Sequence, residues 1–261
     1  MNSTDSRPAA ESIDSGHYPG SPVERNHVAP VARRMRATFD GVTVVDTTQA
    51  LYVWEHPHYP QFYIPAADVD TSVLVDGADQ EKTAQGMSSV QSLVHGERRV
   101  DRAGRLLGEA AIEGLEATYR FEWDAMDAWF EEDEQVFVHP RSPYVRVDAL
   151  RSSRRVRIEK DGVVLADSTS PVVLLETGLP ARFYLPRTDL AWEHLVPVDT
   201  QTKCPYKGIT TGYWSVSVNG TSYADLAWSY DFPVRECAPI AGLVCFYNEK
   251  VDVFIDGVRE V

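Results

Sequence analysis

The sequence predicts two tandem domains that are built almost entirely from β-strands. One observation is a repeat: residues 33–69 align without a gap with residues 154–190, and the glycine pair gives the offset 162 − 41 = 121. Thirteen of these 37 aligned positions are identical, whereas unrelated segments of ordinary composition would share about two. The other observation is that both copies consist of short apolar segments separated by turn dipeptides, as in a β-meander. A tandem duplication of one all-β domain accounts for both.

The repeat also sets the predicted domain limits. Residues 1–30 are rich in Ser, Pro, Gly and Asp and poor in large aliphatic side chains, which is typical of a disordered tail. We place the first repeat at residues 31–150 and the second at residues 151–261. Residues 139–153 form the passage between the repeats, where Pro140 and Pro143 prevent a continuous helix.

The proximal half of the second copy shows the predicted strands most clearly. Val156 and Ile158 alternate with charged residues, and the dipeptide Asp161-Gly162 that follows favours a tight hairpin because glycine accepts a positive φ. Residues 163–165 begin the return strand. Residues 171–176 and 181–186 are two further apolar strands joined by a short turn. The same order of elements recurs in the first copy.

The distal halves have diverged further. In the second copy, residues 213–218 and 221–230 flank an Asn-Gly dipeptide, which is a strong hairpin signal, and residues 251–255 alternate as a half-buried last strand does. In the first copy we align residues 117–123 with 225–230, and residues 126–138 with the segment from 242, so that Phe130 corresponds to Phe246. We expect short helical segments at residues 106–116 and 126–132, and a mobile loop within the charged stretch 76–105.

Composition places the protein among soluble globular proteins. The 261 residues carry a net charge of −14, so we expect neither a nucleic-acid partner nor an anionic membrane surface. The chain has no apolar run of about 18 residues that could span a bilayer, and its N-terminus lacks the basic and apolar regions of a signal peptide. Three cysteines without CxxC spacing indicate a reducing compartment rather than a disulfide framework or zinc ribbon. We therefore predict a cytoplasmic location.

Longer blocks of sequence are similar to a known family. In the second repeat these blocks are DGVVLADS, LLETGLPARFYLP, TKCPYKGITTGYWSV, DLAWSY and APIAGLVCFYNEKVDVFIDG. In the first repeat they are FDGVTVVDTTQALYVWEHPHYPQFYIP and MDAWFEEDEQVFVHPRSPYVRVD. The blocks resemble DUF427, a bacterial and fungal domain of unknown function, and the two matches cover nearly all of the chain after residue 30.

The resemblance implies a fold and carries a functional label. It implies Mss4-like, β-tent domains made of small, curved, antiparallel sheets, and a label of nucleotidyltransferase type. The residues do not support that activity, because the chain lacks a Walker loop, a glycine-rich phosphate loop before a helix, and a carboxylate pair placed to hold magnesium. β-Tent relatives often hold a zinc ion with two cysteine pairs, which this chain lacks. The sequence therefore names no cofactor.

The motif KCPYKG at residues 203–208 occurs only in the second repeat and is the sharpest candidate for chemistry. A cysteine between two lysines in a turn shaped by Pro and Gly suits an exposed thiolate, so Cys204 is a candidate nucleophile. Lys207 is suited to hold an anionic group as a point charge. In the alternative interpretation the motif is only a turn, with Cys204 packed inward and both lysines solvated.

Glu176 and its counterpart Glu55 each end an apolar segment. A buried carboxylate is costly unless it is paired, so we expect each glutamate to have a basic partner. Arg157 and Arg36 are shared by both copies and are the predicted partners. We interpret such a pair first as architecture, and Glu176 also as a candidate catalytic residue beside Cys204.

Aromatic residues gather in the strands and turns of the second repeat. Tyr and Trp combine an apolar ring with a polar tip, so they line small-molecule sites as well as cores. Turn chemistry alone would account for the Asn at position 248. The predicted ligand-binding residues are Arg157, Tyr184, Tyr206, Trp214, Trp228, Asn248 and Glu249.

The first repeat offers a weaker metal signal. His56 and His58 lie two residues apart, and imidazole suits several transition metals. A third ligand could come from His139 or from the acidic residues 131–133, but no fixed spacing supports one. A solvated turn with surface histidines is the favoured interpretation.

These candidates leave three classes of function. The first is an enzyme or binding domain that takes a small molecule in the second repeat, with a structural first repeat. The second is ligand binding by both repeats or between them, without covalent chemistry. The third is a non-enzymatic interaction or structural protein with an acidic surface. Because KCPYKG is confined to one copy, the sequence favours the first.

Overall fold

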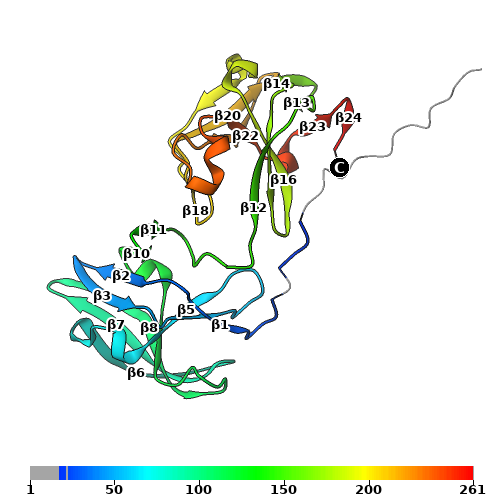
Figure 1. The fold of residues 1–261 in the computed structure, drawn as a ribbon. Coiled ribbons are helices and arrows are strands. Elements are labelled where there is room, and N and C mark those ends of the chain that lie inside the picture. Colours follow the sequence, from blue (N-terminus) through cyan, green and yellow to red (C-terminus); the bar gives the residue numbers. More distant parts are fainter. Residues whose placement is uncertain (1–17, 22, 261) are drawn as a thin grey trace, which may run out of the picture. The chain divides into compact units, whose positions relative to one another are not determined.

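The computed structural model describes residues 18–21 and 23–260, which form two compact units. The N-terminal unit comprises residues 21–144, and the C-terminal unit comprises residues 145–260 together with residues 18–20. Of the tail predicted over residues 1–30, residues 1–17 and 22 lie outside the described part of the chain, whereas Val28–Pro30 forms strand β1. Figure 1 shows strands throughout both units, with short 3-10 turns between them. The predicted all-β fold class with two similar halves is confirmed.

The N-terminal unit contains a seven-stranded and a four-stranded sheet. The larger has the order β1-β4-β5-β9-β8-β7-β6, and the smaller the order β11-β10-β2-β3. The strands are β1 (Val28–Pro30), β2 (Met35–Phe39), β3 (Val42–Thr47), β4 (Leu51–Val53), β5 (Gln61–Pro65), β6 (Leu74–Thr83), β7 (Gly86–His95), β8 (Arg98–Ala110), β9 (Thr118–Phe121), β10 (Ala128–Glu131) and β11 (Glu134–Val136). The 3-10 turns are η1 (Ala66–Asp68), η2 (Thr71–Val73) and η3 (Trp123–Ala125).

The C-terminal unit repeats this plan. Its larger sheet has the order β12-β15-β16-β22-β21-β20-β17, its smaller sheet the order β14-β13-β23-β24, and β18 pairs with β19 in a separate hairpin. The strands are β12 (Val147–Arg151), β13 (Val156–Lys160), β14 (Val163–Ser168), β15 (Val172–Glu176), β16 (Leu179–Leu185), β17 (Leu195–Pro197), β18 (Lys203–Cys204), β19 (Gly208–Ile209), β20 (Gly212–Val218), β21 (Thr221–Ser229), β22 (Val244–Phe246), β23 (Asp252–Ile255) and β24 (Val258–Arg259). The 3-10 turns are η4 (Arg187–Asp189), η5 (Trp192–His194), η6 (Arg235–Ile240) and η7 (Asn248–Lys250).

Strand pairing corrects our alignment of the distal halves. Phe130 of β10 lies opposite Arg36, and Phe254 of β23 lies opposite Arg157. Phe130 therefore corresponds to Phe254 and not to Phe246. By the same reasoning β8 corresponds to β21 and β9 to β22, because each pair holds the same place in the two sheet orders. Sequence similarity had shifted the match by one strand because the copies differ in length between these elements.

Three long strands replace the predicted loop and helix in the N-terminal unit. β6, β7 and β8 form consecutive antiparallel hairpins over residues 74–110. The strand β8 covers residues 106–110 of the stretch 106–116 that we expected to be helical, and bends and turns follow it, so that prediction was wrong. Edge strand β6 is largely exposed, which explains its charged sequence: acidic side chains on an edge strand face water and discourage pairing with other chains.

Each larger sheet has two different faces. The inner face packs on the smaller sheet, and in the C-terminal unit it carries Phe183, Leu185 and Val216 against Ile158 and Ile255. The outer face carries the side chains that alternate with these, and they form a second cluster with η6. The period-two alternation of the strands thus supplies two apolar surfaces from one sheet.

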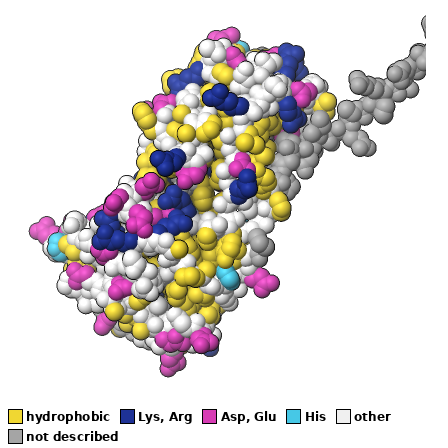
Figure 2. Space-filling model, in the orientation of Figure 1, with side chains coloured by type: hydrophobic (Ala, Val, Ile, Leu, Met, Phe, Trp, Pro, Cys, Tyr) yellow, Lys and Arg dark blue, Asp and Glu magenta, His cyan; other side chains and the backbone are white. Residues whose placement is uncertain are grey.

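Charged side chains of both signs cover the molecule. On the face shown in Figure 2, Lys and Arg side chains lie next to Asp and Glu on both units. Many of them form ion pairs, such as Arg34 with Asp46 at 2.5 Å and Arg102 with Asp79 at 2.9 Å. Within the described residues, no helix is long and apolar enough to cross a bilayer.

Candidate functional site

A buried ion pair lies on the outer face of the C-terminal unit. Glu176 is the last residue of β15 and points to the same side as Val172 and Leu174 because strand residues alternate. Lys207 comes from the turn between β18 and β19. Its Nζ lies 2.5 Å from Glu176 Oε2, and the Lys207 and Glu176 side chains are only 14% and 9% exposed. The lysine is therefore a desolvated cation held by one carboxylate.

The KCPYKG turn is held against the segment that leads into η6. Cys204 pairs directly with Gly208 across the hairpin, and Gly208 has φ of +99°, a conformation that favours glycine. The Val234 amide donates to the Lys207 carbonyl at 3.1 Å. Cys237 Sγ donates to the Tyr206 carbonyl at 3.3 Å. These bonds fix the backbone that presents Lys207 to Glu176.

Electrostatics keep Lys207 charged. Burial by itself would lower the pKa of Lys207, but the neighbouring Cys204 thiol and the Glu176 carboxylate outweigh it and raise that pKa above its ordinary value. Burial has the opposite effect on the acids nearby. It raises the pKa of Cys237 to about 12, and it raises the pKa of Tyr230 with help from Cys204. At neutral pH Lys207 is therefore charged, whereas Cys237 and Tyr230 are protonated.

Aromatic residues form the rest of this face. Trp228 Nε1 donates to Tyr184 Oη at 3.2 Å, and the Tyr213 and Tyr247 hydroxyls lie 2.6 Å apart. The ring centroids of Trp228 and Tyr247 are separated by 4.4 Å. These rings belong to the outer-face cluster, in which Tyr184, Tyr213 and Trp228 are buried and their polar tips are hydrogen-bonded.

The structure brings only part of the predicted site together. Glu176, Lys207, Cys204, Tyr206, Tyr184 and Trp228 belong to the outer face or to the turn that covers it. Glu249 lies at the edge of this face, where it binds Arg182 through two hydrogen bonds of 2.6 and 2.8 Å. Asn248 instead ties η7 to the Ala181 carbonyl at 3.0 Å. Trp214 belongs to the inner-face cluster and stacks edge-on with Trp192.

Arg157 is not the partner of Glu176, which corrects our prediction. Arg157 lies on β13 in the smaller sheet, where it pairs with Glu159 at 3.0 Å and covers the Phe254 ring. Arg36 likewise pairs with Asp133 at 2.7 Å and covers Phe130. Both copies have this arginine because it covers an equivalent phenylalanine in each. Its presence in both copies therefore did not indicate a contact with the glutamate that both copies also share.

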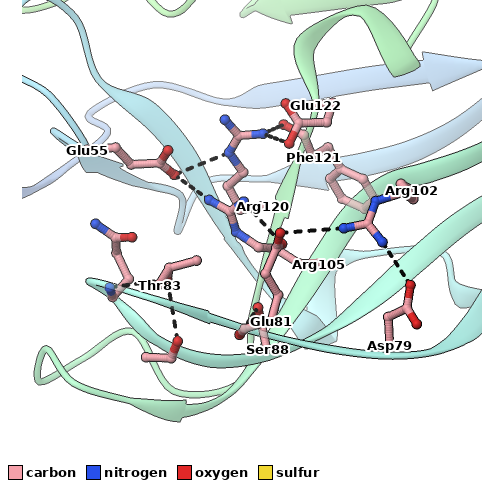
Figure 3. Close-up of polar contacts among 12 residues, drawn as sticks. Glu55, Asp79, Glu81, Thr83, Ser88, Arg102, Arg105, Arg120, Phe121 and Glu122 are labelled. Atoms are coloured by element: carbon pink, nitrogen blue, oxygen red, sulfur yellow. Dashed lines mark hydrogen bonds and ion pairs between the residues drawn. The ribbon is translucent and has the colours of Figure 1, made fainter.

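The counterpart glutamate of the N-terminal unit has different partners. Glu55 Oε1 accepts hydrogen bonds from Arg105 Nη2 at 2.9 Å, Arg120 Nε at 3.2 Å and Tyr63 Oη at 3.0 Å. Figure 3 shows both guanidinium groups converging on this carboxylate, with Glu122 beside Arg120. Arg105 and Arg120 lie directly opposite each other on β8 and β9. Glu55 therefore separates two like charges that would otherwise face each other.

The two outer faces share a frame and differ in filling. Tyr63 corresponds to Tyr184 by the repeat offset, as Glu55 does to Glu176. In the matching strands, the cross-strand pair Arg105 and Arg120 takes the place of Trp228 and Cys245. An internal ion network thus fills the N-terminal face, whereas aromatic rings, thiols and one lysine fill the C-terminal face.

The histidine pair of the N-terminal unit does not gather further ligands. The rings of His56 and His58 have centroids 5.8 Å apart, and burial together with His58 lowers the pKa of His56. His139 stacks on Tyr59 at 4.1 Å. Across residues 18–21 and 23–260, no three His, Cys, Asp or Glu side chains are placed to hold a metal ion.

Three contributors to the site were missing from the predicted set. Arg182 could have been found, because it is two residues before Tyr184 on one strand and so shares its face. Tyr230 could have been found in the same way, because it is two residues after Trp228 and shares its face. Cys237 could not. Cys237 reaches the KCPYKG turn only through the packing of η6, which no local pattern announces.

Fold and site together define a protein of two homologous all-β domains, in which equivalent sheet faces carry a common Glu and Tyr but different cations. The family model of the domain of unknown function DUF427 matches residues 27–132 and 148–257. The chain therefore belongs to the DUF427 family and contains two copies of its domain. A search of curated proteins found no significant match.

Proposed function

We propose that the C-terminal unit binds a small molecule on its outer face, at Lys207, and that the N-terminal unit is its structural partner. The observation that carries this proposal is the Lys207–Glu176 pair, whose side chains are 14% and 9% exposed. Maintaining a buried ion pair is seldom the cheapest way to stabilise a fold. Lys207 lies on a turn that only one repeat contains, and this favours a role in binding over a role in the architecture common to both repeats.

The residues around Lys207 suggest the chemistry of the ligand. A buried ammonium is a point charge for a carboxylate or phosphate group, and such a group would compete with Glu176 for it. The rings of Trp228 and Tyr247, which contact each other on the same face of the sheet, would contact an apolar or aromatic body. We therefore propose an organic anion as the ligand class. In this arrangement Glu176 holds Lys207 in place until the ligand binds.

Cys204 is the candidate nucleophile at this site. It is half-buried, carries a free thiol and interacts electrostatically with Lys207. Cysteine sulfur is a strong nucleophile, and Cys204 lies three residues before Lys207 in the same turn. A Cys204→Ala protein that both binds and turns over the ligand would rule out this role and leave binding intact.

The contents of the N-terminal face support an asymmetric division of roles. There Glu55 is already bound by two guanidinium groups and one hydroxyl. A ligand anion would have to displace this carboxylate from three partners rather than from one. The face with the single lysine is therefore the better candidate for exchange with a ligand.

Native mass spectrometry of the purified protein, followed by denaturing extraction, tests the proposal. We expect a bound organic anion that is retained by Lys203→Ala and lost from Lys207→Ala. Lys203 is the matched control because it is an exposed lysine of the same hairpin. The extracted compound is then added back to ligand-free protein and its binding measured by calorimetry. Equal binding by the two variants would overturn the proposal.

A further inference from the structure

Two of the three cysteines lie on segments that are in direct contact. Cys204 opens the β18–β19 hairpin, and Cys237 lies in η6. Cys237 Sγ is 3.3 Å from the carbonyl oxygen of Tyr206, which is two residues from Cys204. Two residues of chain span at most about 7 Å, and less within a turn. The hairpin contact therefore places two cysteines that are 33 positions apart in sequence (237 − 204 = 33) on adjoining segments.

The two thiols differ in ways that suit a stepwise oxidation. Cys204 is half-buried and therefore open to a small oxidant, whereas Cys237 is fully buried. Both interact electrostatically with the Lys207 ammonium, and burial raises the pKa of the Cys237 thiol, which suits it to be the protected second thiol. A reactive, accessible thiol beside a protected second thiol is the arrangement found at reversible redox sites.

We propose that Cys204 and Cys237 form an intramolecular disulfide when the protein meets a hydroperoxide. In the first step the Cys204 sulfur attacks the terminal peroxide oxygen and forms an S–O bond while the O–O bond breaks. The other oxygen takes the thiol proton and leaves as water from hydrogen peroxide, or as an alcohol from an organic hydroperoxide. In the second step the Cys237 sulfur attacks the Cys204 sulfenic acid. The S–O bond then breaks, and the oxygen leaves as water with the Cys237 proton. The two sulfurs are oxidised by two electrons in total, and one hydroperoxide is reduced.

The disulfide would link the KCPYKG turn covalently to η6. This turn carries Lys207, so its motion relative to Glu176 would be restricted in the oxidised protein. Cys245 is excluded from the pair because it lies in the middle of the larger sheet on β22, where its thiol donates to the Phe246 carbonyl of the same strand and not to the hairpin. This modification does not depend on the proposed ligand and can be tested on the protein without one.

The test treats the full-length protein with one equivalent of hydrogen peroxide, followed by intact mass analysis and non-reducing peptide mapping. We expect a mass loss of two hydrogen atoms, a linked peptide pair containing Cys204 and Cys237, and reversal by dithiothreitol. The Cys245→Ser variant is the matched control and should form the same link. The Cys204→Ser variant should not form it.

Peptide mapping of the unaltered protein keeps the test decisive even where a serine variant folds poorly. The proposal is overturned by a link between Cys204 and Cys245, by disulfides formed only between molecules, or by oxidation of Cys204 to the sulfinic acid without a link. Binding of the organic anion is measured separately on reduced protein, so failure of one proposal does not imply failure of the other.

Discussion

Replacing Lys207 by methionine should destabilise the C-terminal unit strongly. The substitution keeps an unbranched side chain of similar length and removes the cation from Glu176, which is 9% exposed. Breaking a buried ion pair by removing one partner costs about 3–5 kcal/mol. Because Glu176 ends its strand and retains slight exposure, we expect the lower value, about 3 kcal/mol. For a protein of this size that corresponds to a decrease in Tm of about 10 °C.

A double-mutant cycle with urea denaturation separates the charge effect from lost packing. Glu176→Gln alone leaves the Lys207 ammonium buried and should also be destabilising. The double variant contains two neutral side chains, so it should recover about 2 kcal/mol relative to the sum of the single changes. Arg155→Met is the matched control, since its pair with Asp167 is 60% and 32% exposed and should contribute under about 1 kcal/mol.

Two results would refute this reasoning. If Lys207→Met lies within about 0.5 kcal/mol of the unaltered protein, the Glu176 carboxylate must reach water or another partner. If the double variant shows the full sum of both losses, the two side chains contribute independently and do not interact.

Three further predictions concern packing, pH and the N-terminal ion network. Gly104→Ala should cost about 2 kcal/mol because a Cβ there would lie 2.7 Å from the Phe121 ring and 2.9 Å from a backbone oxygen. The control Gly108→Ala lies on the same strand and should be tolerated, because the atom nearest to its Cβ would be 3.9 Å away. Equal urea midpoints for the two variants would contradict this prediction. The pKa of Tyr230 is raised in the folded protein, so its contribution to stability is complete below pH 10 and is lost as pH rises toward the folded-state pKa. Tyr230→Phe should therefore reduce the alkaline loss of stability by about 1.4 kcal/mol per pH unit. An unchanged slope of stability against pH in circular dichroism titrations would show that the hydroxyl already reaches solvent. Glu55→Gln should cost about 3 kcal/mol in urea denaturation, because it leaves two opposed guanidinium groups without their shared carboxylate. A loss under about 1 kcal/mol would mean that the other acidic neighbours suffice to neutralise the two arginines.

Much of the fold could be predicted from sequence because strand signals are local. Alternation at Val156 and Ile158 and the turn at Asp161-Gly162 depend on neighbouring residues, and the structure places a strand, a turn and a strand there. The stretch 106–116 was misjudged for the opposite reason. Its Leu and Ala residues have high helix propensity, but pairing of β8 with β7 and β9 overrode that preference.

The site could be predicted only where a residue's position on a strand determined its face. Glu176 and Tyr184 fall on the outer face by alternation, and both were identified. The cation bound to Glu176 could not be derived in this way, because Lys207 reaches it through a turn that is 31 residues away. Arg157 was predicted as the partner because it is basic and present in both copies, but its strand belongs to the smaller sheet.

The comparison of the two outer faces indicates where the duplicated domains diverged. Both keep a glutamate at the end of one strand and a tyrosine on the next, so the duplication preserved the acceptor. The cations were replaced by non-equivalent residues: arginines within the sheet in one unit, and a lysine on an added turn in the other. Arg105 and Arg120 lie on paired strands of the larger sheet, whereas Lys207 belongs to the separate β18–β19 hairpin. Our proposal that a ligand replaces the internal carboxylate at the C-terminal face uses this difference, and it predicts loss of ligand from Lys207→Ala with retention by Lys203→Ala.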